Sequence, residues 1–292
     1  MAAPRISVCV PTRGRPLALA RCLAALGRST LPPHELEVVV VGDGPDVEGP
    51  APGAAGAVPV RWRTRPRGGP AAARNLAAEL ASAPTLAFID DDCVPAADWA
   101  ERILARVEAD PDAVVAGRVR NGLPGNRWAT ASHMVLEVVV DMYNARPGQG
   151  GFAPTSNLAM TRELFLGLGG LDERFRTAAA EDRDFCDRSH EAGHALVIEE
   201  GAVVEHLHDL DARAFLAQAA SYGRGEVTYR ALCAERGRKP NVVRRSFYLR
   251  LVLAALSHGP RRAVPLVCMA AVSQLVFLAN YWSARSGRPA AR

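Results

Sequence analysis

Residues 85–92 read TLAFIDDD, a short apolar run that ends abruptly in three adjacent carboxylates. Comparable runs occur at 6–11 (ISVCVP), 37–41 (EVVVV) and 58–64, and stretches of helical composition lie between them, one ending near Gly27 and another covering 70–81. Continuous apolar strands that alternate with helices are typical of a parallel sheet covered on both faces. The sequence therefore predicts an α/β fold.

Polar side chains follow each of these runs. Thr12 and Arg15 come after the first run, Asp43 after the second and Asp90–Asp92 after the fourth, while the helix at 70–81 carries Arg74. In open α/β sheets the ligand lies beyond the carboxyl ends of the strands. We therefore expect these side chains to gather at one edge of the sheet.

The three carboxylates favour a cation site. No GxGxxG follows the first strand and no Walker sequence occurs, so the phosphates of a nucleotide would need another counter-charge. Turn and N-cap chemistry would explain a single Asp, but three in a row repel one another without a cation. Asp90–Asp92 thus indicate a site for Mg²⁺ or Mn²⁺ that could bridge a diphosphate. For Asp43, a Gly-Asp-Gly-Pro turn is as good an explanation as a nucleobase contact.

The second half of the chain offers different chemistry. A glycine turn and a strand-like run cover 150–161, and a helix opens at Glu181 and Asp182. Two acids at a helix N-terminus are explained by the macrodipole, which would also keep a carboxylate ionised, as a general base requires. Short strands are expected at 195–198 and 202–205, followed by His206 and His208. At a period of two these histidines face one side, so either or both could bind a metal or simply form hydrogen bonds.

Composition and charge narrow the class of protein. With 49% hydrophobic and 23% charged residues the chain is neither disordered nor fibrous. The net charge of +4 divides into −8 for residues 1–211 and +12 for residues 212–292. Such asymmetry suggests nucleic acid or an anionic membrane as partner. The six cysteines form no CxxC pair, and no signal peptide precedes the first strand, so we expect a reduced, cytosolic compartment without a structural zinc site.

The basic tail contains two apolar stretches, 247–257 and 263–282. Its positive residues lack interleaved stacking aromatics, which argues against nucleic acid. The second stretch has 20 uncharged residues and could just span a bilayer, but Pro265, Gln274 and Asn280 make it only mildly apolar. We favour helices that lie on the cytoplasmic leaflet over a spanning helix or over packing and oligomer contacts.

Seven motifs in order carry a family resemblance: VCVPTRGRP, VVVVGDGP, GGPAAARNLA, FIDDDCVP, SNLAMTRELFLGLGGLDERF, AEDRDFCDRSHEAGH and VVEHLH. Over about residues 5–225 the chain resembles the family 2 inverting glycosyltransferases. The resemblance implies a GT-A fold, a Rossmann-like and mostly parallel sheet flanked by helices. It divides the chain into a catalytic domain, 1–225, and a basic, apolar helical tail, 226–292.

The resemblance also implies roles for single residues. Asp182 matches the catalytic base, and Asp92 and His206 match the metal-side residues, His206 better than His208. The residues implied to bind the donor are Pro11, Thr12 and Arg15 around the base and ribose, Asp43 at the nucleobase, Arg74 at the ribose or diphosphate, Asp90 and Asp91 nearer the ribose and sugar, and Asn157 beside the sugar. At Gly14-Arg15 the chain departs from many relatives, which carry an Asn near this turn.

The implied reaction moves a sugar from a nucleoside-diphosphate sugar, with a UDP-sugar as the first choice, to an acceptor hydroxyl with inversion. The enzyme would be of the hexosyltransferase type and would use Mn²⁺ or Mg²⁺. Its acceptor would be lipid-linked or a glycan, reached from the cytoplasm or at the inner face of the membrane, with no nucleic-acid partner. The alternatives are a non-catalytic sugar-nucleotide-binding or scaffold protein of this fold, and a nucleotidyltransferase, which the late Glu-Asp helix fits poorly.

Overall fold

The computed structural model of the chain describes residues 3–145, 151–240 and 246–286. The strands are β1 Ile6–Thr12, β2 Leu36–Asp43, β3 Val60–Arg65, β4 Thr85–Phe88, β5 Cys93–Pro95, β6 Val114–Asn121, β7 Leu158–Thr161 and β8 Leu196–His206. The helices are α1 Pro16–Leu26, α2 Pro70–Leu80, α3 Trp99–Ala109, α4 Arg127–Asn144, α5 Arg162–Gly167, α6 Glu181–Glu191, α7 Ala212–Glu235, α8 Ser246–Ser257 and α9 Pro260–Arg285, with a 3₁₀ turn η1 at Thr155–Asn157.

The strands form one mixed sheet, mostly parallel, in the order β3-β2-β1-β4-β7-β6-β8-β5. β3, β2, β1 and β4 run parallel, and so do β6 and β8. β7 is antiparallel to both β4 and β6, and β5 is antiparallel to β8. The carboxyl ends of β1, β2 and β4 therefore meet at one edge, as the sequence predicts.

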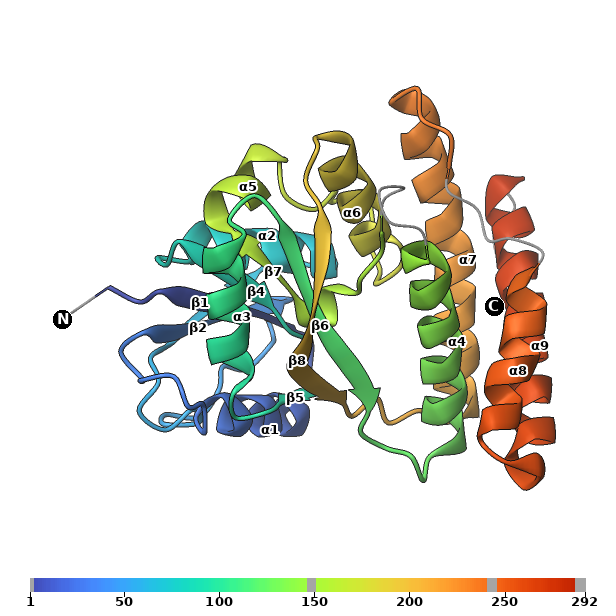
Figure 1. The fold of residues 1–292 in the computed structure, drawn as a ribbon, viewed down its shortest axis with the longest axis horizontal. Helices are drawn as coiled ribbons and strands as arrows, with labels where there is room; N and C mark the ends of the chain where they lie inside the picture. The colour runs from blue at the N-terminus through green and yellow to red at the C-terminus, as the bar shows by residue number, and fades with distance from the viewer. Residues whose placement is uncertain (1–2, 146–150, 241–245, 287–292) are drawn as a thin grey trace.

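Helices cover both faces of the sheet because its central strands are apolar on both sides (Figure 1). On β1 the side chains alternate: Ile6, Val8 and Val10 pack with α1 and α3, whereas Cys9 packs in the cluster formed by α2, α5 and α6. This period-two division places one hydrophobic core on each face. The predicted α/β fold class, a mostly parallel sheet flanked by helices, is thus confirmed.

Two sequence-based expectations for the second half need correction. β8 is one continuous strand where two short strands were expected, because its pairing with β6 continues through a register shift between Gly117 and Arg118. Gly117 pairs with Glu199 and Arg118 pairs with Val203, so three residues of β8 bulge out without ending the strand. The strand-like run at 150–161 forms a strand only from Leu158 onward, and Gly150 lies outside the described residues.

A further helical layer, made of α4, α7, α8 and α9, lies beyond the sheet and shares its own hydrophobic cluster (Figure 1). α7 runs unbroken across residue 225, where the sequence suggested a domain boundary. It approaches α9 closely, since a Cβ added to Gly223 would lie 2.3 Å from the Phe277 carbonyl oxygen. The α8–α9 hairpin is thus packed on the rest of the chain, and the division at residue 225 stays a prediction.

Candidate active site

Two of the three adjacent carboxylates are tied to the end of β1. Asp91 is fully buried and accepts a hydrogen bond of 2.6 Å from the Thr12 hydroxyl, while the Arg15 guanidinium, at the start of α1, contacts both Asp91 and Asp92. Burial raises the pKa of Asp91 to about 6, although Arg15 and Thr12 oppose the shift. The structure thus brings Thr12, Arg15 and the acidic cluster together as predicted, and it places the Arg15 charge on the carboxylates themselves.

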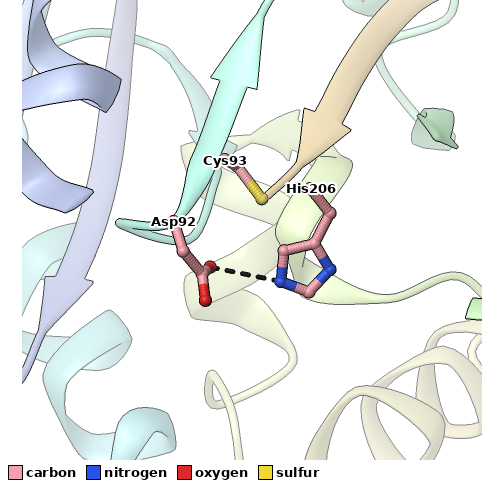
Figure 2. Close-up of side chains that lie close together, drawn as sticks. All are labelled: Asp92, Cys93 and His206. Atoms are coloured by element: carbon pink, nitrogen blue, oxygen red, sulfur yellow. Dashed lines mark ion pairs between the residues drawn. The ribbon is translucent and has the colours of Figure 1, made fainter. Parts of the chain in front are cut away.

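Asp92 faces the end of β8. Its Oδ1 lies 3.2 Å from Nε2 of His206, and Cys93 completes a group whose potential ligand atoms all lie within 4.8 Å of one another (Figure 2). Cys93 comes close because β5 pairs with β8 in a register that sets Cys93 opposite His206. His208 instead stacks on the His206 ring, with 4.9 Å between centroids. Geometry therefore favours His206 over His208 as the residue that faces Asp92.

The residues at this point suit a divalent cation. Asp92 Oδ1 is buried and has no hydrogen-bond donor of good geometry among the described residues. Burial opposes ionisation, but His206 and Arg15 outweigh it and hold the pKa of Asp92 below its usual range, so the carboxylate is charged. One carboxylate oxygen and one imidazole nitrogen suit Mn²⁺ better than Mg²⁺, which prefers oxygen ligands throughout. Burial keeps the Cys93 thiol protonated by raising its pKa, so we regard it as a neighbour of the site and not as a first ligand.

A buried arginine connects the acidic cluster to the start of α6. Arg74, on α2, donates to Asp90 Oδ1 at 2.5 Å and to Glu181 Oε1 at 3.1 Å, and its side chain is only 3% exposed. Burial opposes the charge, but these acids dominate and raise its pKa. Arg74 therefore holds the two carboxylates on either side of it. Removing any one of the three groups would be costly, because it would leave a charge without its partner in a desolvated place.

The turn before α6 positions Asp182. Ala180 adopts a left-handed backbone, with φ of 69°, and Glu181 Oε2 accepts a hydrogen bond of 2.7 Å from the Ala179 amide. Asp182 Oδ1 accepts one from the Arg183 amide at 2.8 Å. Burial, reinforced by the charge of Glu181, raises the pKa of Asp182 to about 7. The expectation that the helix terminus alone keeps this carboxylate ionised is therefore wrong, because desolvation and the neighbouring acid outweigh the dipole.

Two predicted donor contacts already have partners within the protein. Asp43 accepts hydrogen bonds from the amides of Gly68 and Gly69, between 2.8 and 3.2 Å, and so fixes the turn before α2. Asn157 is fully buried: its amide donates to the carbonyls of Arg118 and Ala202 and accepts from the Trp99 indole. Both donor hydrogens of Asn157 are used, so we assign it a structural role that joins β6, β8 and α3. Pro11 is buried near the end of β1.

Sequence reasoning gave no separate role to two residues that the structure brings into the site. Glu181 was read only as one of two helix-terminal acids, yet it anchors both Arg74 and the turn that carries Asp182. Cys93 was set aside with the other cysteines, and its position beside His206 depends on strand register. The AED sequence could have pointed to Glu181, whereas nothing local could have pointed to Cys93.

The sheet order, with a carboxylate cluster at its edge and an acidic helix terminus nearby, is the arrangement that the GT-A fold has. Residues 7–169 match the model of the glycosyl transferase family 2, and the chain belongs to this family.

Relatives and solved structures agree with this membership. The chain is 28% identical over 226 residues to the pre-mycofactocin glycosyltransferase of Mycobacterium tuberculosis, covering 75% of this chain and 46% of that protein. It is 24% identical over 203 residues to the glycosyltransferase AglE of Haloferax volcanii, covering 66% and 64%. The chain thus spans about half the length of the first relative.

Among solved structures, the mannosyltransferase PcManGT of Pyrobaculum calidifontis, in complex with GDP-Man and Mn²⁺, superposes with a TM-score of 0.62 at 18% identity, over 99% of this chain and 89% of that one. S. aureus TarS 1-349 in complex with UDP gives a TM-score of 0.51 at 16% identity, over 98% and 93%. At these identities the likeness establishes the fold.

Proposed function

We propose that the protein is an inverting glycosyltransferase that moves a hexose from a nucleoside-diphosphate sugar to an acceptor hydroxyl, with Asp182 as the general base. The observation that carries the proposal is the continuous chain of contacts from Asp90 through Arg74 to Glu181, which holds the turn carrying Asp182 at a fixed distance from the acidic cluster. Inversion places the attacking hydroxyl and the leaving group on opposite sides of the anomeric carbon, so the base and the leaving-group site must be held apart, as a fixed link of this kind can do.

The reaction needs one proton acceptor and a stabilised leaving group. An acceptor hydroxyl attacks the anomeric carbon, its bond to the sugar forms as the bond to the diphosphate breaks, and Asp182 takes the hydroxyl proton. A pKa of about 7 suits this step, since general bases work best with a pKa near the operating pH. In the structure Arg15 pairs with Asp91 and Asp92 at the end of β1, and we propose that its positive charge also faces the departing diphosphate.

A divalent cation held by Asp92 and His206 would neutralise charge on the departing diphosphate. The donor set supports its binding, and so does the Asp92 oxygen that faces His206 without a well-formed hydrogen bond. Mn²⁺ accompanies the donor in PcManGT. The neighbours hold GDP-Man in one case and UDP in another, so the proposal extends to nucleoside-diphosphate sugars, with UDP-sugars as the first to test.

The rival proposal, a non-catalytic sugar-nucleotide-binding protein, needs the acidic cluster but has no use for Asp182. A partly buried carboxyl with a pKa of about 7 beside Glu181 is costly for a binding protein and useful to an enzyme. We therefore favour catalysis. We further propose that the enzyme works in the cytoplasm at the inner face of the membrane, on a lipid-linked or glycan acceptor.

The test is Asp182→Asn, with Glu191→Gln as a matched control at the other end of α6. We expect Asp182→Asn to keep thermal stabilisation by the donor and Mn²⁺ but to lose sugar transfer by roughly 10²-fold or more, the usual effect of removing a positioned base. Glu191, whose side chain is half exposed, should tolerate the change. Transfer by Asp182→Asn at the wild-type rate would show that another group is the base.

A further inference from the structure

The outer face of the α8–α9 hairpin is apolar and uncovered. Most of the exposed large hydrophobic side chains of the described chain lie here, and we call this set the apolar stripe: Tyr248, Leu249, Val252, Leu253 and Leu256 on α8, and Val264, Val272, Leu275, Leu278 and Trp282 on α9. Contiguous exposed apolar surface of this kind marks a site of interaction.

The stripe is continuous along α9. Its members from Val264 to Trp282 recur every three or four residues or at multiples of that spacing, so they share one side of the helix. At 1.5 Å per residue this side is about 27 Å long. The opposite side, which includes Leu266, Ser273 and Tyr281, is buried against the neighbouring helices. The exposed apolar residues are therefore not needed for packing within the chain.

Positive charge lies at both ends of the α9 part of the stripe. Arg261 and Arg262 lie at the start of α9 and Arg285 lies at its end, while Arg250 lies among the stripe residues of α8. The sequence contains no Asp or Glu after Glu235. A surface that is apolar in the middle and basic at its borders complements an anionic bilayer, in which acyl chains lie beneath negatively charged headgroups.

A cavity at the C-terminal end of α9, where the helix meets α7, adds a place for a headgroup. It has a volume of about 310 Å³, lies between α7 and α9, and is lined in part by Arg230, Tyr281 and Arg285. Arg285 donates to the Tyr281 hydroxyl at 3.3 Å, and Trp282 follows directly in the chain. Arg230 pairs with Glu226 at 2.7 Å, whereas Arg285 pairs with no carboxylate of the described residues. Arg285, with the Tyr281 hydroxyl beside it, is therefore the group best suited to bind a phosphate here.

We infer that the apolar stripe docks on an anionic phospholipid bilayer, with α9 lying in the plane of the interface and the Arg230–Arg285 cavity taking a lipid phosphate. The inference deepens the proposed placement at the inner face of the membrane and makes no use of the catalytic assignment.

Two contacts favour a helix that lies in the interface over one that spans the bilayer. α9 is long and apolar enough to cross a membrane, and 28% of its most apolar 18-residue stretch is buried within the protein. However, its inner side is fixed to α7: Gly223 meets the Phe277 backbone, and Arg224 donates to Asn280 at 3.2 Å. A spanning α9 would have to break this packing and take Asn280 into lipid, which is costly.

A second copy of the chain is the main competing occupant. A two-fold dimer through the stripe would bring the same all-basic borders together, with no carboxylate from either hairpin to pair with them. A lipid surface supplies the missing negative charge, so we commit to the bilayer.

The test is co-sedimentation of the full chain with vesicles. The vesicles contain phosphatidylcholine alone, or with about 30 mol% phosphatidylglycerol, at low and high salt. We expect binding to the anionic vesicles only, weakened by salt because the attraction is partly electrostatic. Leu275→Ser/Trp282→Ser should lower binding tenfold or more, on the order expected from two exposed apolar side chains. Arg261→Gln/Arg262→Gln should lower it roughly 10- to 30-fold.

Matched controls lie on α1 and in the turn directly after it, away from the hairpin (Figure 1). They are Leu17→Ser, at a side chain that is 79% exposed, and Arg21→Gln/Arg28→Gln, and both should bind vesicles like the wild type. An alkaline carbonate wash should release the bound protein.

Three results would each overturn the inference: absence of binding to anionic vesicles, equal binding by the stripe and control variants, or retention on the vesicles after the carbonate wash. The last result would favour a spanning helix. A wild-type dimer that Leu275→Ser/Trp282→Ser converts to a monomer, without vesicle binding, would identify the stripe as a self-association surface. Donor-induced thermal shifts measured on the same variants separate this failure from a failure of the proposed function.

Discussion

Glu181→Gln offers the sharpest prediction about the proposed base. In the structure Glu181 accepts from Arg74 at 3.1 Å and from the Ala179 amide at 2.7 Å. Glutamine has the same size and retains an acceptor oxygen, so the turn should persist while the negative charge beside Asp182 disappears. Burial and this charge together raise the pKa of Asp182 to about 7, and removal of Glu181 also frees Arg74 to favour the ionised form of Asp182. Both effects lower the pKa of Asp182.

The magnitude follows from the titration. Only ionised Asp182 can accept a proton, so the wild-type rate should fall about tenfold per pH unit below pH 7 and level off above it. Neighbouring acids of this kind are coupled by on the order of one pK unit. The acid limb of Glu181→Gln should therefore lie about one pH unit lower, and at pH 6 this variant should keep roughly half of its plateau rate, whereas the wild type keeps roughly a tenth.

The assay is release of nucleoside diphosphate at saturating donor and acceptor between pH 5 and 9, repeated at several Mn²⁺ concentrations. Glu191→Gln serves as control, since it removes a charge from the far end of α6. If the acid limb of the pH–rate profile shifts with Mn²⁺ concentration, the limb reflects titration of the metal-binding residues and not of Asp182. An acid limb at the same pH in Glu181→Gln and the wild type would refute the reasoning.

Three further predictions concern stability and metal binding. The pKa of Asp182 is raised in the folded state, so ionisation of Asp182 destabilises the fold as pH rises through about 7. Asp182→Asn removes this effect. Measured by calorimetry, the variant should melt at least ~2 °C above the wild type at pH 8 and at the same temperature near pH 4. Asp92→Asn should abolish the rise in melting temperature that Mn²⁺ gives the wild type, and an unchanged rise would place the cation elsewhere. Gly225→Ala should destabilise the protein in urea, because the new Cβ would lie 2.4 Å from the Ala179 Cβ, whereas Gly167→Ala meets nothing within 4 Å and should be tolerated.

The sheet core was accessible from sequence because burial on both faces leaves a continuous apolar run. β1, β2 and β4 show this directly, and the polar residues after them meet at one edge as expected. The antiparallel half was harder to predict. β5 has only three residues, and Glu200-Gly201 within β8 resembles a strand break although pairing with β6 resumes at Val203. Short strands and bulges are stabilised by their partners, which the local sequence does not contain.

The residue types of the site were predictable, but their couplings were not. Asp92 and His206 face each other as expected, yet Cys93 joins them only through the β5–β8 register. The bridge that Arg74 makes between Asp90 and Glu181 spans three elements distant in sequence. The pKa of Asp182 depends on burial created by this packing, so helix-terminal chemistry alone gave the wrong direction.

The proposed reaction is metal-assisted transfer from a nucleoside-diphosphate sugar. The most direct measurement is turnover of a donor panel, UDP- and GDP-sugars first, with Mn²⁺ or with excess chelator, for the wild type, Asp92→Asn and Asp182→Asn. We expect one donor to be consumed by the wild type with Mn²⁺, little turnover in chelator or by Asp92→Asn, and a loss of roughly 10²-fold or more for Asp182→Asn despite retained donor binding. Full turnover in excess chelator, or by both variants, would contradict the account.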